Sequence, residues 1–355
     1  MKAVVLRNTN DLAVCEVPVP QLSPDQVLVR TTHCGICGSD IRYLRGDNPW
    51  AKQTLGEKHT NPPNIILGHE VTGVVEAVGS RCDVNLVGKR VAIVAFGTCG
   101  KCIYCRRGEE HLCAETQHLG HGAGWGESDY YYGGMAEYVP VNEKWLVLLP
   151  ETISNEAGAL LDPLGVAVHG VKTANVREDD VVLIVGGGAV GALAVSVARA
   201  RGAKYVVLLD ICDSVLPVAE CMGADYAVNP MREDVADLIK DLSGGHGAEA
   251  IIDTVGAPLM TYLPLLARGG TYVTMTVTSD SQDFKTILLA GERTIKSSCN
   301  FQYSDYWEAL SLLENSETDF CSIITHRFAV DDALEAFRVA EDKAETGAVK
   351  VIILF

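Results

Sequence analysis

The sequence predicts an α/β protein with two domains, a β-rich first domain followed by a doubly wound parallel sheet. At 355 residues, the chain exceeds the size that one hydrophobic core usually serves. Short apolar runs separated by Gly and Pro fill residues 1–155. From about residue 156, apolar runs alternate with segments of helical periodicity. Such alternation is typical of a parallel sheet covered by helices on both faces.

The first domain is expected to consist mainly of short strands. Residues 27–31, 71–78 and 90–94 are the clearest examples, because they are rich in β-branched residues and bounded by turn formers. Few helical periods lie between the strands. We therefore expect a twisted, barrel-like β domain over residues 1–155.

The second domain is expected to alternate strands with helices, including helices over 190–201 and 235–242. Segment 181–200 is almost uncharged and nearly long enough to cross a bilayer. A run of glycines between residues 186 and 191 interrupts it, so we predict a buried strand, a turn and the start of a helix. The expected strands are 181–185, 205–209, 225–228, 250–253 and 271–275.

The composition is that of a soluble globular protein, with 48% hydrophobic and 21% charged residues. A formal net charge of −17 argues against nucleic acid or an anionic membrane surface as a partner. The N-terminal residues do not have the pattern of a signal peptide, and we expect a cytoplasmic protein.

Four cysteines in the spacing C-x2-C-x2-C-x7-C are the strongest local signal. They are Cys99, Cys102, Cys105 and Cys113. Short spacings of this kind let one lobe of backbone supply all four ligands of a tetrahedral zinc. Disulfide pairing and a redox CxxC are the alternatives, but clustered thiols in a reducing compartment favour metal. The sequence therefore predicts a structural zinc here.

A glycine motif after a predicted strand indicates a dinucleotide site. Gly186 permits a tight turn, Gly188 lets backbone amides approach a pyrophosphate, and Gly191 lets helix and strand pack closely. Asp210 ends the next strand, where a carboxylate accepts hydrogen bonds from a free ribose 2′-OH and repels a 2′-phosphate. Residues 211–215 contain no Arg or Lys. NAD is therefore favoured over NADP, although a helix cap is another role for Asp210.

These motifs occur in one order with Gly-Ile-Cys-Gly-Ser-Asp at 35–40, Gly-His-Glu at 68–70, Thr-His-Arg-Phe at 325–328 and Ala-Leu-Glu-Ala-Phe at 333–337. In this combination the whole chain resembles the zinc-containing medium-chain dehydrogenase/reductases of the alcohol dehydrogenase superfamily, closest to the sorbitol and threonine dehydrogenase branch. The resemblance implies a GroES-like catalytic domain with the zinc lobe over 1–155. It also implies a Rossmann NAD-binding domain over 156–295 and a segment, 296–355, that returns to the catalytic domain.

The resemblance also implies a catalytic zinc held by Cys37 and His69. Glu70 is expected as the third ligand, directly or in exchange with water, and Asp162 is expected to touch the zinc or to reach it through a water molecule. Ser39 would hydrogen-bond the reacting oxygen and carry its proton outward. Further cofactor contacts are expected at Val190, Thr254, Val255 and Thr276.

Three departures from the family pattern concern the substrate pocket. Arg42 stands where relatives commonly carry a histidine; it would hold an anionic group or lie on the surface. Gln302 replaces an arginine of the sorbitol dehydrogenases. An insert-like stretch at 120–134 contributes Trp125 and Tyr131, either to the floor of a polyol pocket or to a subunit contact. The stretch 46–63, with Trp50, is a further candidate for the mouth of the site.

Together these observations predict an enzyme that transfers a hydride between NAD and a secondary alcohol or ketone of a polyol, cyclitol or sugar derivative. One catalytic and one structural zinc are expected in each chain. L-threonine 3-dehydrogenase activity is the alternative within the same class. A non-catalytic NAD-binding protein that retains only the structural zinc is the alternative outside it. We also expect a homo-oligomer, with residues 270–275 as a candidate edge strand for pairing.

Overall fold

The computed structural model describes residues 1–49, 61–122, 124–126, 128–277 and 281–355, so Trp50 lies outside the described residues. The chain packs as two compact units. Unit 1 comprises Met1–Asp162 and Ile324–Phe355, and unit 2 comprises Pro163–Ile323. The functional domain limits near residues 155 and 296 remain predictions, because these units are defined by packing alone.

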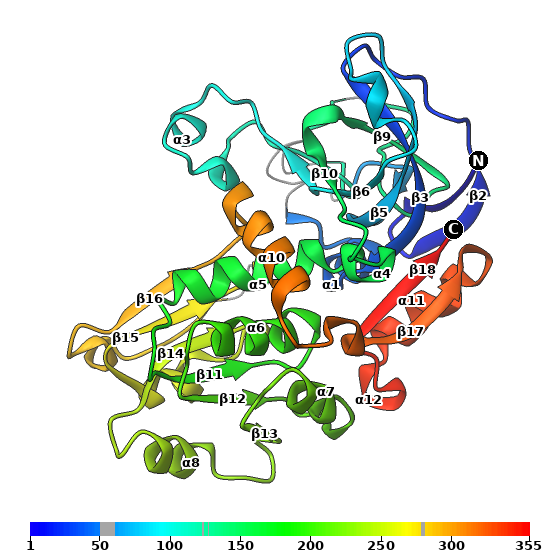
Figure 1. The fold of residues 1–355 in the computed structure, drawn as a ribbon. Helices are drawn as coiled ribbons and strands as arrows, with labels where there is room; N and C mark the ends of the chain where they lie inside the picture. The colour runs from blue at the N-terminus through cyan, green and yellow to red at the C-terminus, as the bar shows by residue number, and fades with distance from the viewer. Residues whose placement is uncertain (50–60, 123, 127, 278–280) are drawn as a thin grey trace. The chain divides into compact units, whose positions relative to one another are not determined.

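Unit 1 is built on a mixed sheet in the strand order β10-β6-β5-β3-β18-β17, with β9 paired beside β3. Figure 1 shows the C-terminal β18, in red, next to the early strand β3, in blue. The C-terminal strands therefore belong to the first β unit. The bounds are β3 (Gln26–Ile36), β5 (Glu70–Val78), β6 (Arg90–Ile93), β9 (Tyr138–Asn142), β10 (Leu146–Leu148), β17 (Ile324–Ala329) and β18 (Lys350–Leu354).

Two smaller sheets and several short helices complete unit 1. The first sheet has the order β2-β1-β4, and the second joins β7 to β8. Alternate residues of the strands, such as Val29, Val71 and Ile93, fill one buried apolar core. The bounds are β1 (Lys2–Asn8), β2 (Asp11–Glu16), β4 (Ile65–Ile66), β7 (Phe96–Gly97), β8 (Gln117–His118), α1 (Gly38–Leu44), α3 (Ile103–Arg106), α4 (Asn155–Ala159), α11 (Ala333–Glu341) and α12 (Lys343–Thr346).

Unit 2 contains a parallel six-stranded sheet in the order β13-β12-β11-β14-β15-β16. This confirms the predicted doubly wound sheet. The expectation that residues 270–275 form an edge strand is wrong, because β16 pairs outside β15 and covers it. The bounds are β11 (Val181–Val185), β12 (Tyr205–Leu209), β13 (Tyr226–Val228), β14 (Ala248–Asp253), β15 (Leu266–Thr274) and β16 (Thr294–Ser297).

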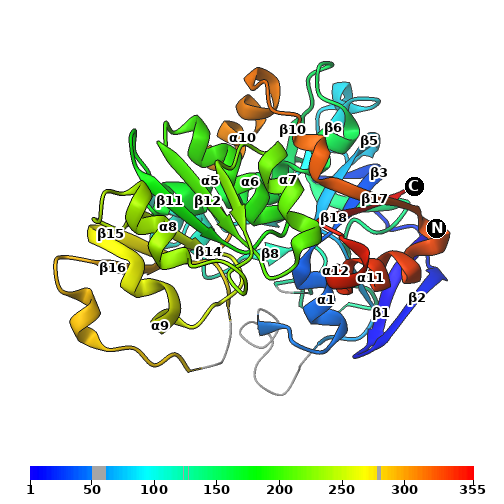
Figure 2. The ribbon, with the colours of Figure 1, turned by 90° about the horizontal axis from the view of Figure 1, so that it is seen from below.

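Helices lie on both faces of this sheet. Figure 1 shows α5 and α6 on one face and α8 on the other, and Figure 2 shows α6 and α7 beside β11 and β12. On the α8 face, Val235 and Ile239 belong to the same buried apolar cluster as Leu183 of β11. The bounds are α5 (Leu161–Thr173), α6 (Ala189–Ala200), α7 (Leu216–Cys221), α8 (Val235–Leu242), α9 (Leu259–Tyr262) and α10 (Tyr303–Asn315).

Among the described residues, no helix combines the length and apolar character that a bilayer crossing requires. Residues 181–200 instead form β11, a glycine turn and α6, as predicted.

Candidate active site

Cys37 is placed by the start of helix α1. The residue is the N-cap, and its backbone N–H donates to Asp40 Oδ2 at 2.9 Å. Asp40 Oδ1 accepts a second hydrogen bond, from the backbone N–H of Gly68 at 3.2 Å. Asp40 is fully buried, and its carboxylate accepts from both segments. It therefore links the Cys37 turn to the segment that carries His69.

His69 and Glu70 lie at the start of β5, next to the end of β3. The candidate ligand atoms of Cys37, His69 and Glu70 all lie within 4.8 Å of one another. Both His69 and Glu70 are buried. The three residues predicted to hold a catalytic zinc are therefore brought together in unit 1.

Glu70 has a partner that the sequence reasoning did not identify. Lys350 Nζ donates to Glu70 Oε1 at 2.7 Å and to Oε2 at 2.6 Å, and also to the Ile36 carbonyl at 3.0 Å. Burial disfavours the charged amine, but Glu70 together with Cys37 and Asp40 outweighs it and raises the pKa of Lys350. A lone lysine inside the apolar run of β18 was the available signal, since an unpaired charge is rarely buried.

The space for this pair depends on Gly35, which lies opposite Glu70 in the register between β3 and β5. A Cβ atom at Gly35 would lie 1.9 Å from Glu70 Oε2. The carboxylate therefore occupies the volume that any other residue would fill. Only glycine at this position lets Glu70 and Lys350 meet across β3.

Asp162, near the start of α5, is buried, and its Oδ1 has no hydrogen-bond partner among the described residues. Burial is the main cause that raises the pKa of Asp162 to about 7; Glu70 and Asp40 add to the shift, while His69 and Lys350 oppose it. A buried carboxylate oxygen without a donor needs another partner, and a metal ion is one such partner.

The charge around His69 suits a cation. Burial by itself disfavours the charged imidazole, but Asp40, Cys37 and Asp162 outweigh it and raise the pKa of His69 well above its ordinary value. His69 Nδ1 is also buried without a hydrogen-bond partner among the described residues. Sulfur, nitrogen and oxygen donors with excess negative charge fit Zn²⁺.

Ser39, on the first turn of α1, has a buried hydroxyl oxygen. This oxygen lies near the Tyr43 hydroxyl but makes no well-formed hydrogen bond with the described residues. An unoccupied hydroxyl two residues from Cys37 is available to hydrogen-bond a substrate oxygen.

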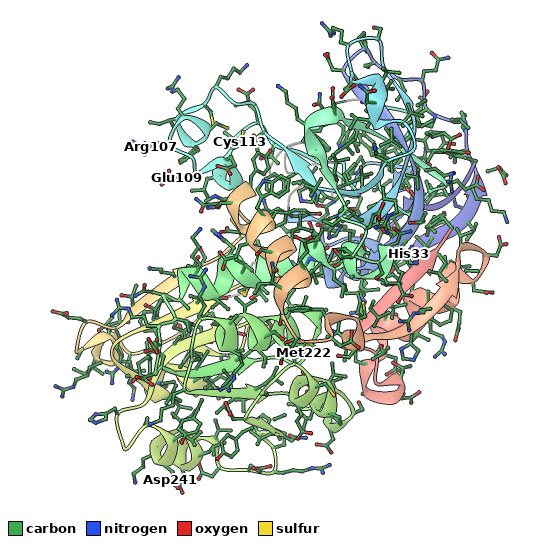
Figure 3. All side chains as sticks on the ribbon, viewed as in Figure 1. His33, Arg107, Glu109, Cys113, Met222 and Asp241 are labelled. Atoms are coloured by element: carbon green, nitrogen blue, oxygen red, sulfur yellow. The ribbon has the colours of Figure 1, made fainter. Side chains whose placement is uncertain are left out.

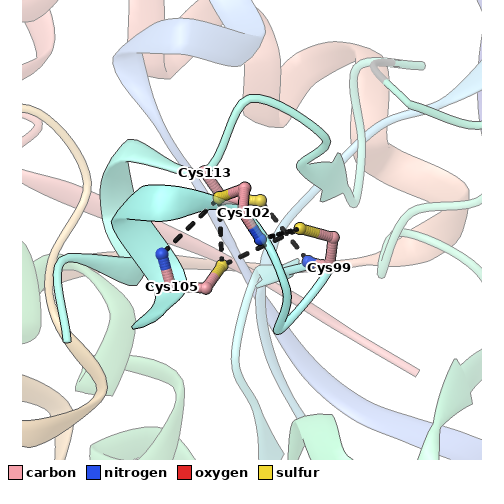
Figure 4. A group of neighbouring side chains, drawn as sticks. All are labelled: Cys99, Cys102, Cys105 and Cys113. Atoms are coloured by element: carbon pink, nitrogen blue, oxygen red, sulfur yellow. Dashed lines mark hydrogen bonds between the residues drawn. The ribbon is translucent and has the colours of Figure 1, made fainter. Parts of the chain in front are cut away.

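The four clustered cysteines converge in a lobe between β7 and β8 (Figure 4). Their sulfur atoms all lie within 4.8 Å of one another, with Cys102 and Cys105 3.5 Å apart and Cys99 and Cys105 4.0 Å apart. A tetrahedron with bonds of about 2.3 Å has edges of about 3.8 Å, so the spacing fits zinc. All four are free thiols, and no disulfide links them.

Backbone N–H groups of the lobe point at the sulfur atoms that would bind a metal. The backbone N–H of Cys105 donates to Cys102 Sγ, and this bond is the main cause that lowers the pKa of Cys102 to about 6. Cys113 Sγ accepts from two backbone N–H groups. Figure 3 shows Arg107, Glu109 and Cys113 together on this lobe. The donor set therefore fits a metal ion.

The predicted dinucleotide residues gather at the carboxyl edge of the parallel sheet in unit 2. Gly186 follows β11 with φ +105°, and Gly188 is the N-cap of α6. A Cβ at Gly191 would lie 1.9 Å from the Gly186 carbonyl oxygen, so helix and turn require glycine here. The start of α6, with Val190, therefore offers free N–H groups to an anion.

Asp210 directly follows β12 at the same edge. Its Oδ2 accepts from the backbone N–H of Gly187 at 2.6 Å, and its Oδ1 accepts from Cys212 N–H at 2.8 Å. Asp210 thus braces the glycine turn. Because β11 lies between β12 and β14, this edge is the switch point at which nucleotides bind in such sheets.

The remaining predicted cofactor residues follow β14 and β15. Thr254 Oγ1 donates to the Val185 carbonyl at 2.9 Å, and Val255 is 57% exposed. Thr276 Oγ1 lies 3.4 Å from Thr274 Oγ1. Thr254 and Val255 therefore lie beside the glycine turn at Gly186, and Thr276 lies beside Gly256 after the next strand.

The four predicted pocket residues have different surroundings. Arg42 pairs with Asp47 Oδ2, at 2.9 Å from Nε and 2.6 Å from Nη2. Tyr131 is buried in the core of unit 1. Trp125 Nε1 donates to the His118 carbonyl at 2.7 Å. Gln302 belongs to unit 2, where it caps α10 and accepts from Lys172.

Two histidines near His69 were missed by the sequence reasoning. The rings of His118 and His121 lie 3.9 Å apart between centroids, and the His118 ring is 5.8 Å from that of His69. Burial lowers the pKa of His118 to about 3 and that of His121 well below its ordinary value. Two histidines three residues apart, just after the cysteine lobe, were the available signal.

Two family models match the chain. Residues 23–151 match the alcohol dehydrogenase GroES-like domain, and residues 189–315 match the zinc-binding dehydrogenase domain. These matches confirm the predicted GroES-like and Rossmann fold class.

Curated relatives match over nearly the whole chain. D-xylulose reductase A of Aspergillus clavatus is 32% identical, covering 98% of this chain and 95% of its own. Sorbitol dehydrogenase of Bacillus subtilis is 29% identical, covering 96% and 93%. L-threonine 3-dehydrogenase of Chromobacterium violaceum is 31% identical, covering 95% of both.

Solved structures agree in fold. An alcohol dehydrogenase from Escherichia coli CFT073, complexed with NADH, has a TM-score of 0.88 at 26% identity and covers 100% and 99% of the two chains. A zinc-binding dehydrogenase from Sinorhizobium meliloti 1021, bound to NADP, has a TM-score of 0.87 at 28% identity with the same coverage. The chain belongs to the zinc-containing medium-chain dehydrogenase/reductases and is a zinc-dependent alcohol oxidoreductase of that family.

Proposed function

We propose that this enzyme oxidises a secondary alcohol of a neutral polyol, cyclitol or sugar derivative with NAD, and reduces the corresponding ketone with NADH. The convergence of Cys37, His69 and Glu70, with ligand atoms within 4.8 Å of one another, is the observation that carries the proposal. A non-catalytic role would give no reason to assemble three buried or half-buried ligand groups at this place.

The catalytic zinc would be held by Cys37 and His69, with a carboxylate as the third ligand. Glu70 belongs to the close cluster, but both of its oxygens accept hydrogen bonds from Lys350. Asp162 has a buried oxygen that the described residues leave without a donor. We propose that Glu70 and Asp162 are the two candidates for this position, in direct contact or through a water molecule.

When bound, zinc would lower the pKa of the substrate alcohol and NAD would accept the hydride. The residues of the chain position the reactants and move the proton. Ser39 accepts the proton of the substrate hydroxyl at Oγ as it releases its own. Arg42 cannot act as a base near neutral pH and is held by Asp47, so the proton leaves Ser39 by another route.

We propose NAD as the cofactor and two zinc ions per chain. Asp210 supports NAD because a carboxylate directly after the second strand of such a sheet would hydrogen-bond a free ribose 2′-OH and would repel a 2′-phosphate. The four-cysteine lobe would hold the structural zinc. Gly186, Gly188, Val190 and Gly191 would bind the pyrophosphate, with Thr254, Val255 and Thr276 beside it.

A polyol substrate is supported by relatives that are named sorbitol dehydrogenase and D-xylulose reductase. L-threonine 3-dehydrogenase activity is the second candidate, because relatives of similar identity carry that name. The carboxylate of threonine calls for a free cation in the pocket. The pairing of Arg42 with Asp47 therefore favours a neutral substrate.

Two further proposals concern the whole protein. Residues 1–155 would act as the catalytic domain, residues 156–295 as the NAD-binding domain and residues 296–355 as a returning segment. We also propose a homo-oligomer in the cytoplasm.

The test combines NADH formation with metal analysis. Purified protein is assayed with sorbitol, xylitol, inositol and L-threonine, each with NAD and with NADP, before and after chelation. We expect NAD-dependent oxidation of a polyol that chelation abolishes, and two zinc ions per chain. Cys37→Ser should lose activity and one zinc, whereas Cys34→Ala, at a buried cysteine three residues away, should retain both zinc ions. Oxidation of threonine alone would establish the second candidate instead.

A further inference from the structure

We propose that His118 and His121 form a subsite that hydrogen-bonds hydroxyl groups of a neutral polyhydroxylated substrate. The inference rests on the proposed function, because it names what this site recognises beyond the reacting alcohol. We define the His118–His121 pair as these two side chains, both of which belong to unit 1.

The pair lies directly beside the proposed zinc ligand His69. The His118 ring stacks on Phe96 at 5.9 Å and meets His69 edge-on at 5.8 Å. The centroid of the His118 ring also lies 3.9 Å from that of His121, which in turn lies 5.4 Å from the ring of Tyr43. A substrate whose alcohol reacts at the His69 site would thus bring its neighbouring carbons to these rings.

The main chain fixes the pair in this position. The Leu119 N–H donates to the Ala95 carbonyl at 2.8 Å, and the buried Asn48 amide donates to the His121 carbonyl at 3.0 Å. A Cβ at Gly120 would lie 2.7 Å from the carbonyl oxygen of Gly68, the residue before His69. The segment is therefore packed closely against Gly68, the residue before His69.

The nitrogen atoms of His121 have no hydrogen-bond partner among the described residues. The side chain is 1% exposed, and neither Nδ1 nor Nε2 makes a hydrogen bond with any described residue. Buried polar atoms are nearly always hydrogen-bonded, so a buried ring with two unsatisfied nitrogens indicates a missing ligand or water.

Hydroxyl groups match what the pair offers. His118 Nδ1 lies 3.0 Å from the Leu119 carbonyl, which can only accept, so the hydrogen is on Nδ1 and Nε2 is an acceptor. A neutral His121 offers one donor and one acceptor, and a hydroxyl group can serve both. Two positive rings at 3.9 Å would repel each other, so the pair does not form a doubly charged anion site. Adjacent hydroxyls of a polyol therefore fit better than a phosphate or carboxylate.

The experiment compares two five-carbon probes, xylitol and 2-pentanol, in the zinc-loaded enzyme with NAD. His121→Phe keeps a ring but removes both nitrogens. We expect it to lower kcat/KM for xylitol by about tenfold or more, with the value for 2-pentanol changed by less than about threefold. His121→Asn restores a donor and an acceptor and should recover part of the loss. His118→Phe should act in the same direction, more weakly because one nitrogen already has a partner.

His326→Phe is the matched control, since His326 also stacks on a phenylalanine, Phe328, in unit 1. This control should leave kcat/KM unchanged for both substrates. Melting temperatures show whether each variant is folded. Equal losses on both probes, or no loss on xylitol, would overturn the inference while polyol oxidation stands. A wild-type enzyme that oxidises 2-pentanol but no polyol would also overturn it. If the enzyme oxidises neither probe and no other polyol, the proposed function is overturned and the inference falls with it.

Discussion

Lys350 and Glu70 form a buried ion pair across 280 positions of sequence, with Nζ 2.7 and 2.6 Å from the two carboxylate oxygens. Lys350 lies on the C-terminal strand β18 and Glu70 at the start of β5, with the end of β3 between them. The pair thereby links the end of the chain to the residue that follows His69. The Lys350 amine compensates the charge of Glu70, in a site that also contains the acidic groups of Cys37, Asp40 and Asp162.

Lys350→Met should be strongly destabilising, because it leaves the Glu70 carboxylate buried without its partner. We expect a loss of about 3–5 kcal/mol in the free energy of unfolding. Chemical denaturation of the zinc-loaded protein measures it. The double variant Lys350→Met/Glu70→Gln should be more stable than Lys350→Met alone. If the two single changes simply add, the pair is not coupled and our interpretation fails.

Gly35→Ala should disturb the same pair from the backbone side. Its new Cβ would lie 1.9 Å from Glu70 Oε2, so the carboxylate must leave its position. Gly38→Ala is the matched control, three residues away, where an added Cβ has no neighbour within 4 Å. We expect a lower melting temperature and weaker zinc retention in Gly35→Ala and little change in Gly38→Ala. Equal melting temperatures in the two variants would contradict the close approach described above.

Zinc titration distinguishes the candidates for the third ligand. If Asp162 contacts the metal, Asp162→Asn should lower the zinc affinity by at least about 10- to 100-fold. Glu70→Gln should then lower the zinc affinity by less. If Glu70 is the ligand, the order reverses. Competition with a chromogenic chelator measures the affinity, and the four-cysteine lobe serves as an internal reference in each sample. Unchanged affinity in both variants would exclude both carboxylates from the metal shell.

Asp210→Ala should weaken the binding of NAD more than the binding of NADP. The carboxylate accepts the Gly187 N–H at 2.6 Å, so its loss loosens the glycine turn for both cofactors. Only NAD would additionally lose the hydrogen bonds to its free 2′-OH, and only NADP would be relieved of repulsion. Fluorescence titration with NADH and NADPH compares the two. Asp213→Ala, three residues along, should preserve the ratio. If Asp210→Ala loses the same affinity for both cofactors, Asp210 does not hydrogen-bond the ribose 2′-OH.

Asp305 should give unit 2 a stability that depends on pH. Burial opposes its ionised form, but hydrogen bonds from His169 and Lys172, at 2.6 and 2.8 Å, outweigh it and lower the pKa to about 2. The unfolded value is about 3.9, so the ionised carboxylate favours the folded state above about pH 4. This contribution is lost as the pH falls from about 4 towards 2.

Asp305→Asn should therefore lower the free energy of unfolding by about 1–3 kcal/mol at pH 7. This deficit relative to wild type should be smaller at pH 3. Urea unfolding at the two pH values measures the difference. Asp241→Asn, at an exposed residue of α8 labelled in Figure 3, is the control and should show almost no deficit. A deficit that stays constant or grows on acidification would contradict the assignment.

Local patterns were sufficient for most secondary structure of unit 2. The predicted strands 181–185 and 205–209 coincide with β11 and β12, and the predicted helix 235–242 coincides with α8. Such agreement is expected because buried parallel strands are continuous apolar runs, and amphipathic helices repeat their apolar residues every three to four positions. The edge of the sheet was predicted wrongly, since β16 has the composition Thr-Ile-Lys-Ser and carries little apolar signal.

The sequence by itself determined the family, the two-part α/β fold and the cysteine lobe, because each rests on short local motifs and on their order along the chain. Only the tertiary structure decided which distant side chains share the interior. The partnership of Lys350 with Glu70, the role of Gly35 beside it and the contact of the His118 ring with that of His121 near His69 depend on strand register and loop packing. Register is set by pairing across hundreds of residues, so no local pattern could have placed these groups together.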